Sequence, residues 1–451
     1  MTAILEALTS FWATRRLSRP GLSRVRFEAA QATALRRWLD RDLPRVDAYG
    51  APPERLEDLP VIDKATLMAD FARFNRAGIT TDAVRAALEG DCRVAGFTVG
   101  ASTGTSGNRG YFVISEAERY RWLGTLLAKA LADMLWQRQR IAILLPQNTR
   151  LYGSARRVPH LDLRFFALAE GATGWRAGLE DYSPTMIVGP PKVLRHMVEA
   201  GFRLHPRRVF SAAETLDPVD RPIIEARFGL PLDQIYMATE GLFAVTCRAG
   251  GLHLAEDSVF FEFEPVGEGL VSPLVTCFRR QAQILARYRM NDLLRLSDRP
   301  CSCGSPLRLV AEVVGRMDDC FRLTGPGGAV LATPDILRNA VLQADGRITD
   351  FRIWQTGLGA GGETQAPPPP PPPPPAAPTP PTCPNPPPLQ PKPRWPKPSP
   401  ASGPRRKSPC AARPFRWSSA TSCAGSSVVC QRACAHDAPL RRARCQYARN
   451  G

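Results

Sequence analysis

Residues 235–241 read I-Y-M-A-T-E-G, an apolar run that passes directly into a hydroxyl and a carboxylate. The run from Ile235 to Met237 predicts a short β-strand, so Thr239 and Glu240 are expected just past the end of that strand. Strand ends are where α/β proteins commonly hold ligands and Mg²⁺. Taken singly, a glutamate here is equally a helix cap or a surface acid, and that alternative stays open at this point.

Strand-like and helix-like segments alternate on both sides of this stretch. Ser115 and Glu118 form a capping box ahead of a long helix predicted for residues 116–135. The alternation predicts an α/β architecture. Further strands are predicted at residues 140–145, 185–188, 208–211, 258–264 and 307–314.

A loop rich in hydroxyl groups and glycine precedes the predicted helix. It consists of Ser102, Thr103, Gly104, Thr105, Ser106 and Gly107, between strand-like residues 97–99 and 111–114. Glycine lets the backbone approach an anion closely, and hydroxyl and N–H groups donate hydrogen bonds to phosphate oxygens. The spacing differs from that of a Walker loop, and no helix is predicted directly after it. The segment therefore predicts a triphosphate-binding loop or, alternatively, a solvated turn.

Two polar segments follow later in the chain. Residues 287–292 (R-Y-R-M-N-D) set Asp292 among basic side chains, and residues 315–319 (G-R-M-D-D) carry Arg316 and Asp318. Viewed alone, the first is a surface ion pair and the second is a polar turn. Their order relative to the other motifs decides their interpretation.

That order resembles the signature of the adenylate-forming ligase superfamily. The Ser/Thr/Gly loop, A-A-E at residues 212–214, Y-x-x-T-E at 236–240, Y-R-x-x-D at 288–292 and G-R-x-D-D at 315–319 follow one another as in that family. The resemblance covers about residues 50–325 and is closest to the phenylacetate-CoA ligase-like, or coenzyme F synthetase-like, branch. It implies a large α/β N-terminal domain followed by a small C-terminal domain.

The resemblance also implies a role for each matched residue. The ATP- or AMP-binding residues would be Ser102 to Gly107 at the β- and γ-phosphates, Ala213, Glu214 and Tyr236 beside the adenine, Asp292 at the ribose hydroxyls, and Arg316. Thr239 would contact the α-phosphate, Glu240 would bind Mg²⁺, and Asp318 would be the hinge. The implied reaction is attack of a carboxylate on the α-phosphate of ATP, which yields an acyl-adenylate and pyrophosphate.

The protein implied by this resemblance is an acid-thiol ligase that uses ATP and Mg²⁺. Its substrate would be a carboxylic acid, aromatic by analogy with the branch, and its acceptor would be the thiol of coenzyme A or of a carrier protein. Dimers are common in the branch, so a homodimer is one expectation. A catalytically impaired, nucleotide-binding member of the same family is the alternative.

The sequence departs from the family pattern in two places, and the second departure motivates that alternative. Asn108, Arg109 and Gly110 follow the loop where the family usually has a basic residue and a proline, so Arg109 would have to supply the charge. The family closes with a small mobile domain that carries a catalytic lysine near its end. Patterned sequence stops near Leu358, and the lysines beyond it, which lie in no recognisable G-K motif, are Lys392, Lys397 and Lys407.

Four residues with soft or borderline metal-ligand atoms form two close pairs. Cys247 and His253 have the spacing C-x₅-H, and Cys301 and Cys303 have the spacing C-x-C. Three thiolates and one imidazole can form a closed tetrahedral zinc site, and members of the branch carry ligands in these contexts. The alternative is that Cys247 is a small core residue and that His253 caps a turn. The pattern predicts one structural Zn²⁺.

Charge and composition divide the 451-residue chain near Leu358. Thirteen Lys and Arg and two acidic residues lie from Leu358 onward, so +11 of the formal +17 belongs to the tail. The remaining body is only mildly basic, so no nucleic-acid partner is expected. The tail contains nine consecutive prolines from Pro367 and lacks apolar periodicity, so it cannot bury enough surface to offset its ordering entropy. It is predicted to be either an out-of-frame translation product or a disordered polyproline II segment that binds a proline-recognition module.

These observations predict three regions. Residues 1–315 would form the large adenylation domain, residues 316–357 the start of an incomplete small C-terminal domain, and residues 358–451 the disordered Pro/Arg-rich tail. No apolar run reaches the 18 residues of a membrane span, so no membrane partner is expected. Arg15 and Arg16 follow the short N-terminal apolar stretch, the reverse of a secretory signal, so a cytoplasmic location is expected.

Overall fold

The computed structural model describes residues 2–102, 110–132, 136–145, 160–168, 171–325 and 328–344, together with Phe351, Ile353 and Gln355. Every described residue lies within the unit Met1–Pro386. Residues 103–107 of the predicted phosphate loop and the predicted tail lie outside the described residues.

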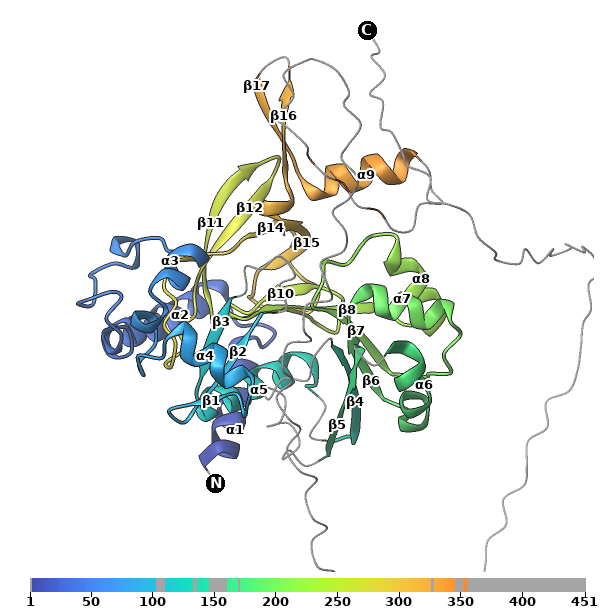
Figure 1. The fold of residues 1–451 in the computed structure, drawn as a ribbon, viewed down its shortest axis with the longest axis horizontal. Coiled ribbons are helices and arrows are strands. Elements are labelled where there is room, and N and C mark those ends of the chain that lie inside the picture. The colour runs from blue at the N-terminus through green and yellow to red at the C-terminus, as the bar shows by residue number, and fades with distance from the viewer. Residues whose placement is uncertain are drawn as a thin grey trace, which may run out of the picture. The chain divides into compact units, whose positions relative to one another are not determined.

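Helices and strands alternate through much of the described chain (Figure 1). The α-helices are α1 (Thr2–Leu17), α2 (Arg24–Arg41), α3 (Lys64–Ala69), α4 (Thr81–Leu88), α5 (Glu116–Ala130), α6 (Gly171–Tyr182), α7 (Pro191–Glu199), α8 (Asp220–Phe228) and α9 (Pro334–Ala344). The strands up to the centre of the main sheet are β1 (Arg93–Val94), β2 (Phe97–Ala101), β3 (Tyr111–Ile114), β4 (Gln139–Leu145), β5 (Leu161–Ala167), β6 (Met186–Gly189), β7 (Arg208–Ala212) and β8 (Leu232–Ala238). The later strands are β9 (Gly241–Thr246), β10 (Leu252–Leu254), β11 (Phe260–Gly267), β12 (Leu270–Thr276), β13 (Tyr288–Arg289), β14 (Asp292–Ser297), β15 (Leu309–Arg316), β16 (Phe321–Gly325) and β17 (Gly328–Ala332).

One half of the main sheet is parallel, with the strand order β5-β4-β6-β7-β8. Ile141 and Ile143 of β4 pack with residues of α1 and α5, whereas Ala142 and Leu144 pack with residues of α6, α7 and α8. This alternation is the two-residue period of a strand. Figure 1 shows α6, α7 and α8 together on one side of these strands. Burial on both faces explains the continuous apolar run I-A-I-L-L at residues 141–145.

The other half of the main sheet is antiparallel and continues from β8 in the order β9-β10-β15-β14-β12-β11. Strand β10 lies between β9 and β15, so it joins two segments that are about sixty residues apart in the sequence. Asp292 of β14 pairs with Arg316 of β15. The motifs at 236–240, 288–292 and 315–319 are therefore carried by strands of a single sheet.

A second sheet, β1-β2-β3, brings the two ends of the predicted phosphate loop together. Strands β2 and β3 are antiparallel, with Thr98 opposite Ile114 and Ala101 opposite Tyr111. A shared apolar core contains Val99 and Val113 together with Phe243 of the main sheet. The loop therefore begins and ends on a hairpin that packs against the antiparallel half of the main sheet.

The segment before α3 is attached to the same half of the sheet. Ile62 forms a parallel bridge with Tyr288. Its N–H donates to the Arg287 carbonyl at 3.1 Å, and its carbonyl accepts from the Arg289 N–H at 2.7 Å. Residues directly after Ile62 are therefore held beside the R-Y-R motif.

The predicted elements agree in kind with the structure, but one helix is shorter than predicted. The capping box is confirmed, with Ser115 Oγ accepting from Glu118 N and Glu118 Oε2 accepting from Ser115 N. The helix predicted for residues 116–135 ends at Ala130, because Leu131 adopts φ −132° and ψ 54°. Arg208 donates a hydrogen bond to the Ala130 carbonyl, which satisfies one of the carbonyls left open at the helix end. The C-terminal end of α5 is therefore stabilised by a contact with Arg208, and the local sequence around Ala130 does not indicate that end.

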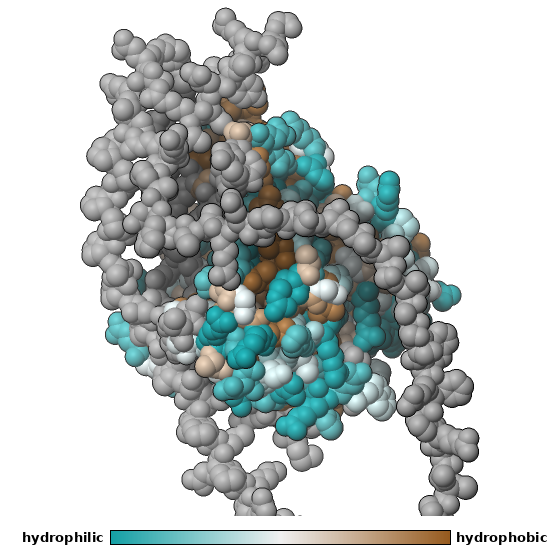
Figure 2. Space-filling view, turned by 90° about the vertical axis from the view of Figure 1, so that its right-hand side faces the viewer, coloured by the Kyte–Doolittle hydropathy of each residue, from teal (hydrophilic) through white to brown (hydrophobic). Residues whose placement is uncertain are grey.

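Within the described ranges, none of the helices combines the length and apolarity that a bilayer crossing requires. Figure 2 shows the side on which α7 and α8 lie in Figure 1. Among the coloured residues in this view, the lower ones are mostly hydrophilic, and hydrophobic residues gather near the centre.

Candidate functional site

The turn between β8 and β9 carries Thr239 and Glu240. Ala238, the last residue of β8, pairs with Gly241, the first residue of β9, so the connection contains only these two residues. Thr239 Oγ1 donates a hydrogen bond of 2.9 Å to Glu240 Oε2. The hydroxyl and the carboxylate therefore lie together at the strand end.

A second hydroxyl orients the same carboxylate. Tyr288 Oη donates to Glu240 Oε1 at 3.0 Å, and Arg280 Nη1 donates to the Glu240 carbonyl at 3.2 Å. Burial and the negative charge of Glu240 raise the pKa of Tyr288, so this phenol remains a protonated donor. Each carboxylate oxygen of Glu240 accepts one hydroxyl hydrogen bond and keeps lone pairs for a further ligand.

Asp292 lies beside this turn and is joined to Tyr236. The Tyr236 hydroxyl donates a 2.6 Å hydrogen bond to Asp292 Oδ2, and Arg316 Nε lies 3.9 Å from Asp292 Oδ1. Burial raises the pKa of Asp292, although the Tyr236 hydrogen bond and the Arg316 charge act in the opposite direction. The structure thus brings three of the predicted nucleotide-binding residues into contact.

The predicted hinge residue follows directly. Asp318 lies in the 3₁₀-helix Met317–Asp319 at the end of β15. Its Oδ2 accepts from Asn291 Nδ2 at 2.5 Å, and the Met317 N–H donates to the Asn291 carbonyl at 3.0 Å. A rotation of the chain at Asp318 would have to break the side-chain contact to Asn291.

The A-A-E motif begins at the last residue of β7, the parallel neighbour of β8. Parallel strands end on the same edge of a sheet, so this motif and the β8–β9 turn lie on one edge. Ala213 has a left-handed backbone conformation with φ 71°, which is uncommon for alanine and marks local strain. Ala213 and Glu214 are both exposed, so they are accessible to a ligand at this edge.

Ser102 closes the base of the predicted phosphate loop. Its N–H donates to the Gly110 carbonyl at 2.8 Å, and its Oγ accepts from the Gly110 N–H at 2.9 Å. A methyl group placed on Gly110 would lie 3.8 Å from Thr239 Oγ1 and 3.9 Å from Ser102 Oγ. The base of the loop therefore faces the β8–β9 turn. The other predicted loop residues, Thr103, Gly104, Thr105, Ser106 and Gly107, lie outside the described residues.

Lys64 approaches the same point, although no sequence motif indicated it. The methyl group placed on Gly110 would lie 3.5 Å from Lys64 Cε. Lys64 is the half-buried first residue of α3. The one available signal was scarcity, since the lysines before Leu358 are only Lys64, Lys129 and Lys192. Tyr288 is the first residue of the Y-R-x-x-D motif, but the family resemblance implied no role for it.

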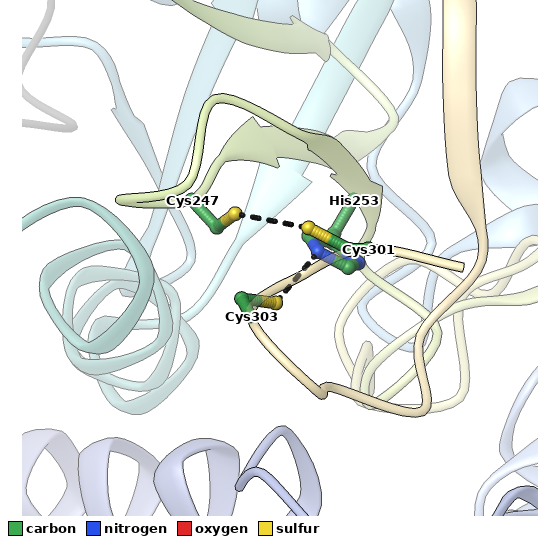
Figure 3. A group of neighbouring side chains, drawn as sticks. All are labelled: Cys247, His253, Cys301 and Cys303. Carbon is green, nitrogen blue, oxygen red and sulfur yellow. Dashed lines mark hydrogen bonds between the residues drawn. The ribbon is translucent and has the colours of Figure 1, made fainter. Parts of the chain in front are cut away.

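The four predicted zinc ligands come together at a second location (Figure 3). Their ligand atoms all lie within 4.8 Å of one another. Cys247 Sγ lies 3.7 Å from Cys301 Sγ, and Cys303 Sγ lies 3.2 Å from His253 Nε2. Two sulfur ligands of one tetrahedral zinc, each about 2.3 Å from the metal, lie about 3.8 Å apart. The spacing of these side chains therefore fits a shared tetrahedral ion.

The backbone around this cluster is arranged in two matching turns. The Gly250 N–H donates to the Cys247 carbonyl at 3.0 Å, and the Gly304 N–H donates to the Cys301 carbonyl at 3.1 Å. A Cβ atom on Gly251 would lie 2.9 Å from Cys301 Sγ, so glycine is needed for this close approach. The two turns place Cys247 and Cys301 next to each other.

The orientation of His253 and the proximity of the cysteine thiols also suit a metal site. His253 is buried, and its Nδ1 lies 2.9 Å from the Leu307 carbonyl, which favours a proton on Nδ1 and directs the Nε2 lone pair at the cysteines. Burial raises the pKa of Cys303 to about 12, and the neighbouring Cys301 and Cys247 add to the shift. A bound cation would offset both effects by stabilising the thiolates.

Comparison with known proteins gives matches at the level of structure. No family model matches the chain, and no curated protein matches its sequence. A structure of 2-hydroxyisobutyryl-CoA ligase in the postadenylation state with 2-HIB-AMP matches with a TM-score of 0.55 and 20% identity, over 73% of this chain and 74% of that chain. The same ligase in an open conformation with 2-HIB-AMP and CoA matches with a TM-score of 0.54 and 18% identity, over 73% of this chain and 76% of that chain.

This likeness concerns the fold alone. At identities near 20%, the substrate of one protein cannot be inferred from that of the other. It agrees with the resemblance that the ordered motifs indicated. The chain has the fold of the adenylate-forming acid-CoA ligases.

Proposed function

We propose that this protein activates a carboxylic acid with ATP to form an acyl-adenylate and then transfers the acyl group to a thiol. The observation that carries the proposal is the Glu240 carboxylate, held by the Thr239 and Tyr288 hydroxyls at the edge where β7 and β8 end. The Tyr236–Asp292 pair lies beside it. This arrangement supplies donors and one oriented carboxylate for a nucleotide and its metal ion.

The proposed nucleotide contacts follow the family resemblance. Asp292 accepts hydrogen bonds from the ribose hydroxyls, and Tyr236 with the A-A-E motif flanks the adenine. Arg316 contacts the nucleotide, and Thr239 donates to the α-phosphate. Ser102, Thr103, Gly104, Thr105, Ser106 and Gly107 would wrap the β- and γ-phosphates. Asp318 would be the hinge of the small domain, whose proposed start is residue 316.

Magnesium fits the donors at the β8–β9 turn. Mg²⁺ prefers oxygen ligands and is commonly held by one or two carboxylates together with substrate phosphates. Glu240 offers such a carboxylate with two hydroxyl donors already orienting it. Bound there, Mg²⁺ would neutralise charge on the phosphates of ATP.

The proposed reaction has two steps, formation of the acyl-adenylate and transfer of the acyl group to the thiol. A carboxylate oxygen of the acid attacks the α-phosphorus of ATP, and the bond from that phosphorus to the oxygen bridging the β-phosphate breaks. Pyrophosphate leaves with the electron pair. The acceptor thiol then loses its proton and attacks the acyl carbon, and AMP leaves. Donors at the β8–β9 turn stabilise the charge that develops at the α-phosphate.

The finer assignments rest on the branch resemblance and on the solved neighbours. An aromatic acid is proposed by analogy with the phenylacetate-CoA ligase-like branch. Coenzyme A is the first acceptor to test, because a matching ligase structure contains CoA, and a carrier-protein thiol is the second. A homodimer is the proposed assembly.

A structural zinc ion is proposed at Cys247, His253, Cys301 and Cys303. The support is the tetrahedral spacing of the four ligand atoms and the orientation of His253 by the Leu307 carbonyl. Four protein ligands would leave no open coordination position, so this ion would have no part in the reaction. It would instead tie the β9–β10 turn to the segment before β15.

Trapping of the intermediate tests the proposed function. The full chain is incubated with ATP, Mg²⁺, hydroxylamine and a panel of aryl and alkyl carboxylic acids. Formation of a hydroxamate and AMP that depends on one of the acids is the expected result, because hydroxylamine captures an acyl-adenylate. ATP binding without hydroxamate from any acid would favour the nucleotide-binding alternative, and absence of ATP binding would contradict both.

A further inference from the structure

The position of Lys64 is fixed from two sides. Ile62 is bridged to the backbone of Arg287, Tyr288 and Arg289. Asp63 caps α3, with its carboxylate accepting from the Thr66 N–H at 2.8 Å. Lys64 lies between this bridge and the body of the helix. Its backbone is therefore held next to Tyr288, the residue whose hydroxyl orients Glu240.

The side chain of Lys64 and the two groups assigned to phosphates all lie close to Gly110. A single methyl group placed on Gly110 would contact Lys64 Cε at 3.5 Å, Thr239 Oγ1 at 3.8 Å and Ser102 Oγ at 3.9 Å. Thr239 is the proposed donor to the α-phosphate, and Ser102 begins the proposed loop around the β- and γ-phosphates. An ammonium group near Gly110 can contact the oxygen between the α- and β-phosphates, or it can contact the β- and γ-phosphates themselves.

The charges that act on Lys64 come from the same site. Burial lowers the pKa of Lys64, while the carboxylates of Glu240 and Asp318 raise it and Arg316 lowers it. Those three charged residues are all proposed parts of the nucleotide site. Lys64 is therefore electrostatically coupled to the site rather than to a separate surface.

We propose that Lys64 binds the departing pyrophosphate portion of ATP and stabilises its charge during adenylate formation. The proposal rests on the proposed function and adds a cation from the N-terminal part of the chain to it. When the bond between the α-phosphorus and the bridging oxygen breaks, that oxygen takes the electron pair, and the ammonium group offsets the added negative charge. This role does not need a lysine from the C-terminal region.

Direct binding measurements on the full chain test this role. Calorimetric titrations with Mg²⁺ and ATP, Mg²⁺ and pyrophosphate, or AMP compare the parent with Lys64→Met, Lys64→Arg and Arg73→Met. Arg73 is the matched control, because it is an exposed cation in the same segment that pairs with Asp70 outside the site. Thermal unfolding of each variant verifies that it is folded.

Lys64→Met is expected to weaken binding of ATP and pyrophosphate by roughly 10- to 100-fold and to leave AMP binding unchanged, as loss of a charged hydrogen bond predicts. Lys64→Arg should recover part of the loss, and Arg73→Met should behave like the parent. Unchanged ATP binding in folded Lys64→Met, or an equal loss of AMP binding, would overturn the inference. Binding needs no acid substrate, so a parent that binds ATP but forms no hydroxamate would contradict the proposed function alone.

Discussion

Glu240 is the residue on which the proposed chemistry depends most. Glu240→Gln keeps the shape and the acceptor oxygen but removes the charge that would hold Mg²⁺. Loss of such stabilisation at the transferring phosphate is expected to lower the rate of hydroxamate formation by about 100-fold or more. The measurement is the rate at saturating ATP and acid, with unfolding temperature as the control for folding. A variant that reacts at the parent rate would remove Glu240 from the site.

The charge of Asp292 is expected to lower the stability of the folded protein while it strengthens the binding of ATP. Because burial raises its pKa, the folded protein binds this proton more tightly than the unfolded chain, and ionisation of Asp292 costs stability. Below the ordinary value of 3.8 the group is protonated in both states and the cost vanishes, whereas the cost grows as pH rises to the folded pKa.

Asp292→Asn is therefore expected to raise the free energy of unfolding increasingly as pH rises above 3.8, up to a plateau above the folded pKa of Asp292. The same variant should bind ATP about tenfold more weakly, since it loses a charged acceptor for the ribose hydroxyls. Denaturant unfolding across this pH range and ATP titration measure the two effects. A variant less stable than the parent at high pH would show that the charge of Asp292 is stabilising.

At this scale the sequence predicted residues that belong to contiguous motifs and missed those that act from elsewhere. Glu240 and Asp292 each stand within a recognisable run, so their polar roles could be expected from sequence order. Lys64 stands alone in an unremarkable segment, and its approach to Thr239 depends on the bridge between Ile62 and Tyr288. Such a bridge between distant segments leaves no local pattern.

Two turns, one after β9 and one before β15, are predicted to depend on zinc. The Cys301→Ser, Cys303→Ser double variant should lose the one zinc ion per chain expected of the parent. Loss of a structural ion costs several kcal/mol, so the unfolding temperature should fall by roughly 10 °C. Elemental analysis and thermal unfolding are the measurements. Cys320→Ser, a thiol outside the cluster, should keep its zinc, and a metal-free parent purified without chelator would end the proposal.

Secondary structure elements were predictable where local chemistry specifies them. The reciprocal hydrogen bonds of Ser115 and Glu118 begin α5 as the capping box required. The end of α5 at Ala130 was missed, since its carbonyl is satisfied by Arg208 from β7, a partner 78 residues away. The proximity of the pair Cys247 and His253 to the pair Cys301 and Cys303 could be expected, because metal-ligand chemistry, unlike helix termination, is visible in residue type and spacing.

For the whole molecule, the region after Leu358 is predicted to add nothing to the proposed activity. The prediction follows from its composition, which favours an out-of-frame or disordered segment over a packed one. A chain that ends at residue 357 should keep the unfolding temperature, the zinc content and the ATP affinity of the full chain. Loss of any of these would show that the last part of the chain contributes to the folded protein.

The class of the fold followed from alternating patterns, but the order of the strands did not. The apolar runs of β4 and β6 helped to predict an α/β sheet, whereas β5, with the sequence L-D-L-R-F-F-A, was not predicted. The placement of β10 between β9 and β15 joins residues 252–254 to both neighbours in space, and nothing in the sequence of those three residues specifies that pairing. Family resemblance, rather than local periodicity, supplied the expectation that the motifs share one site.

Acid-dependent exchange of labelled pyrophosphate into ATP tests the central claim most directly. The reverse of adenylate formation requires the nucleotide, Mg²⁺, the acid and the residues at the β8–β9 turn at once. We predict exchange by the parent chain with at least one acid of the aryl and alkyl panel, no exchange without acid, and loss of exchange in Glu240→Gln. A folded, ATP-binding parent that exchanges no pyrophosphate with any acid would contradict the claim that this site forms acyl-adenylates.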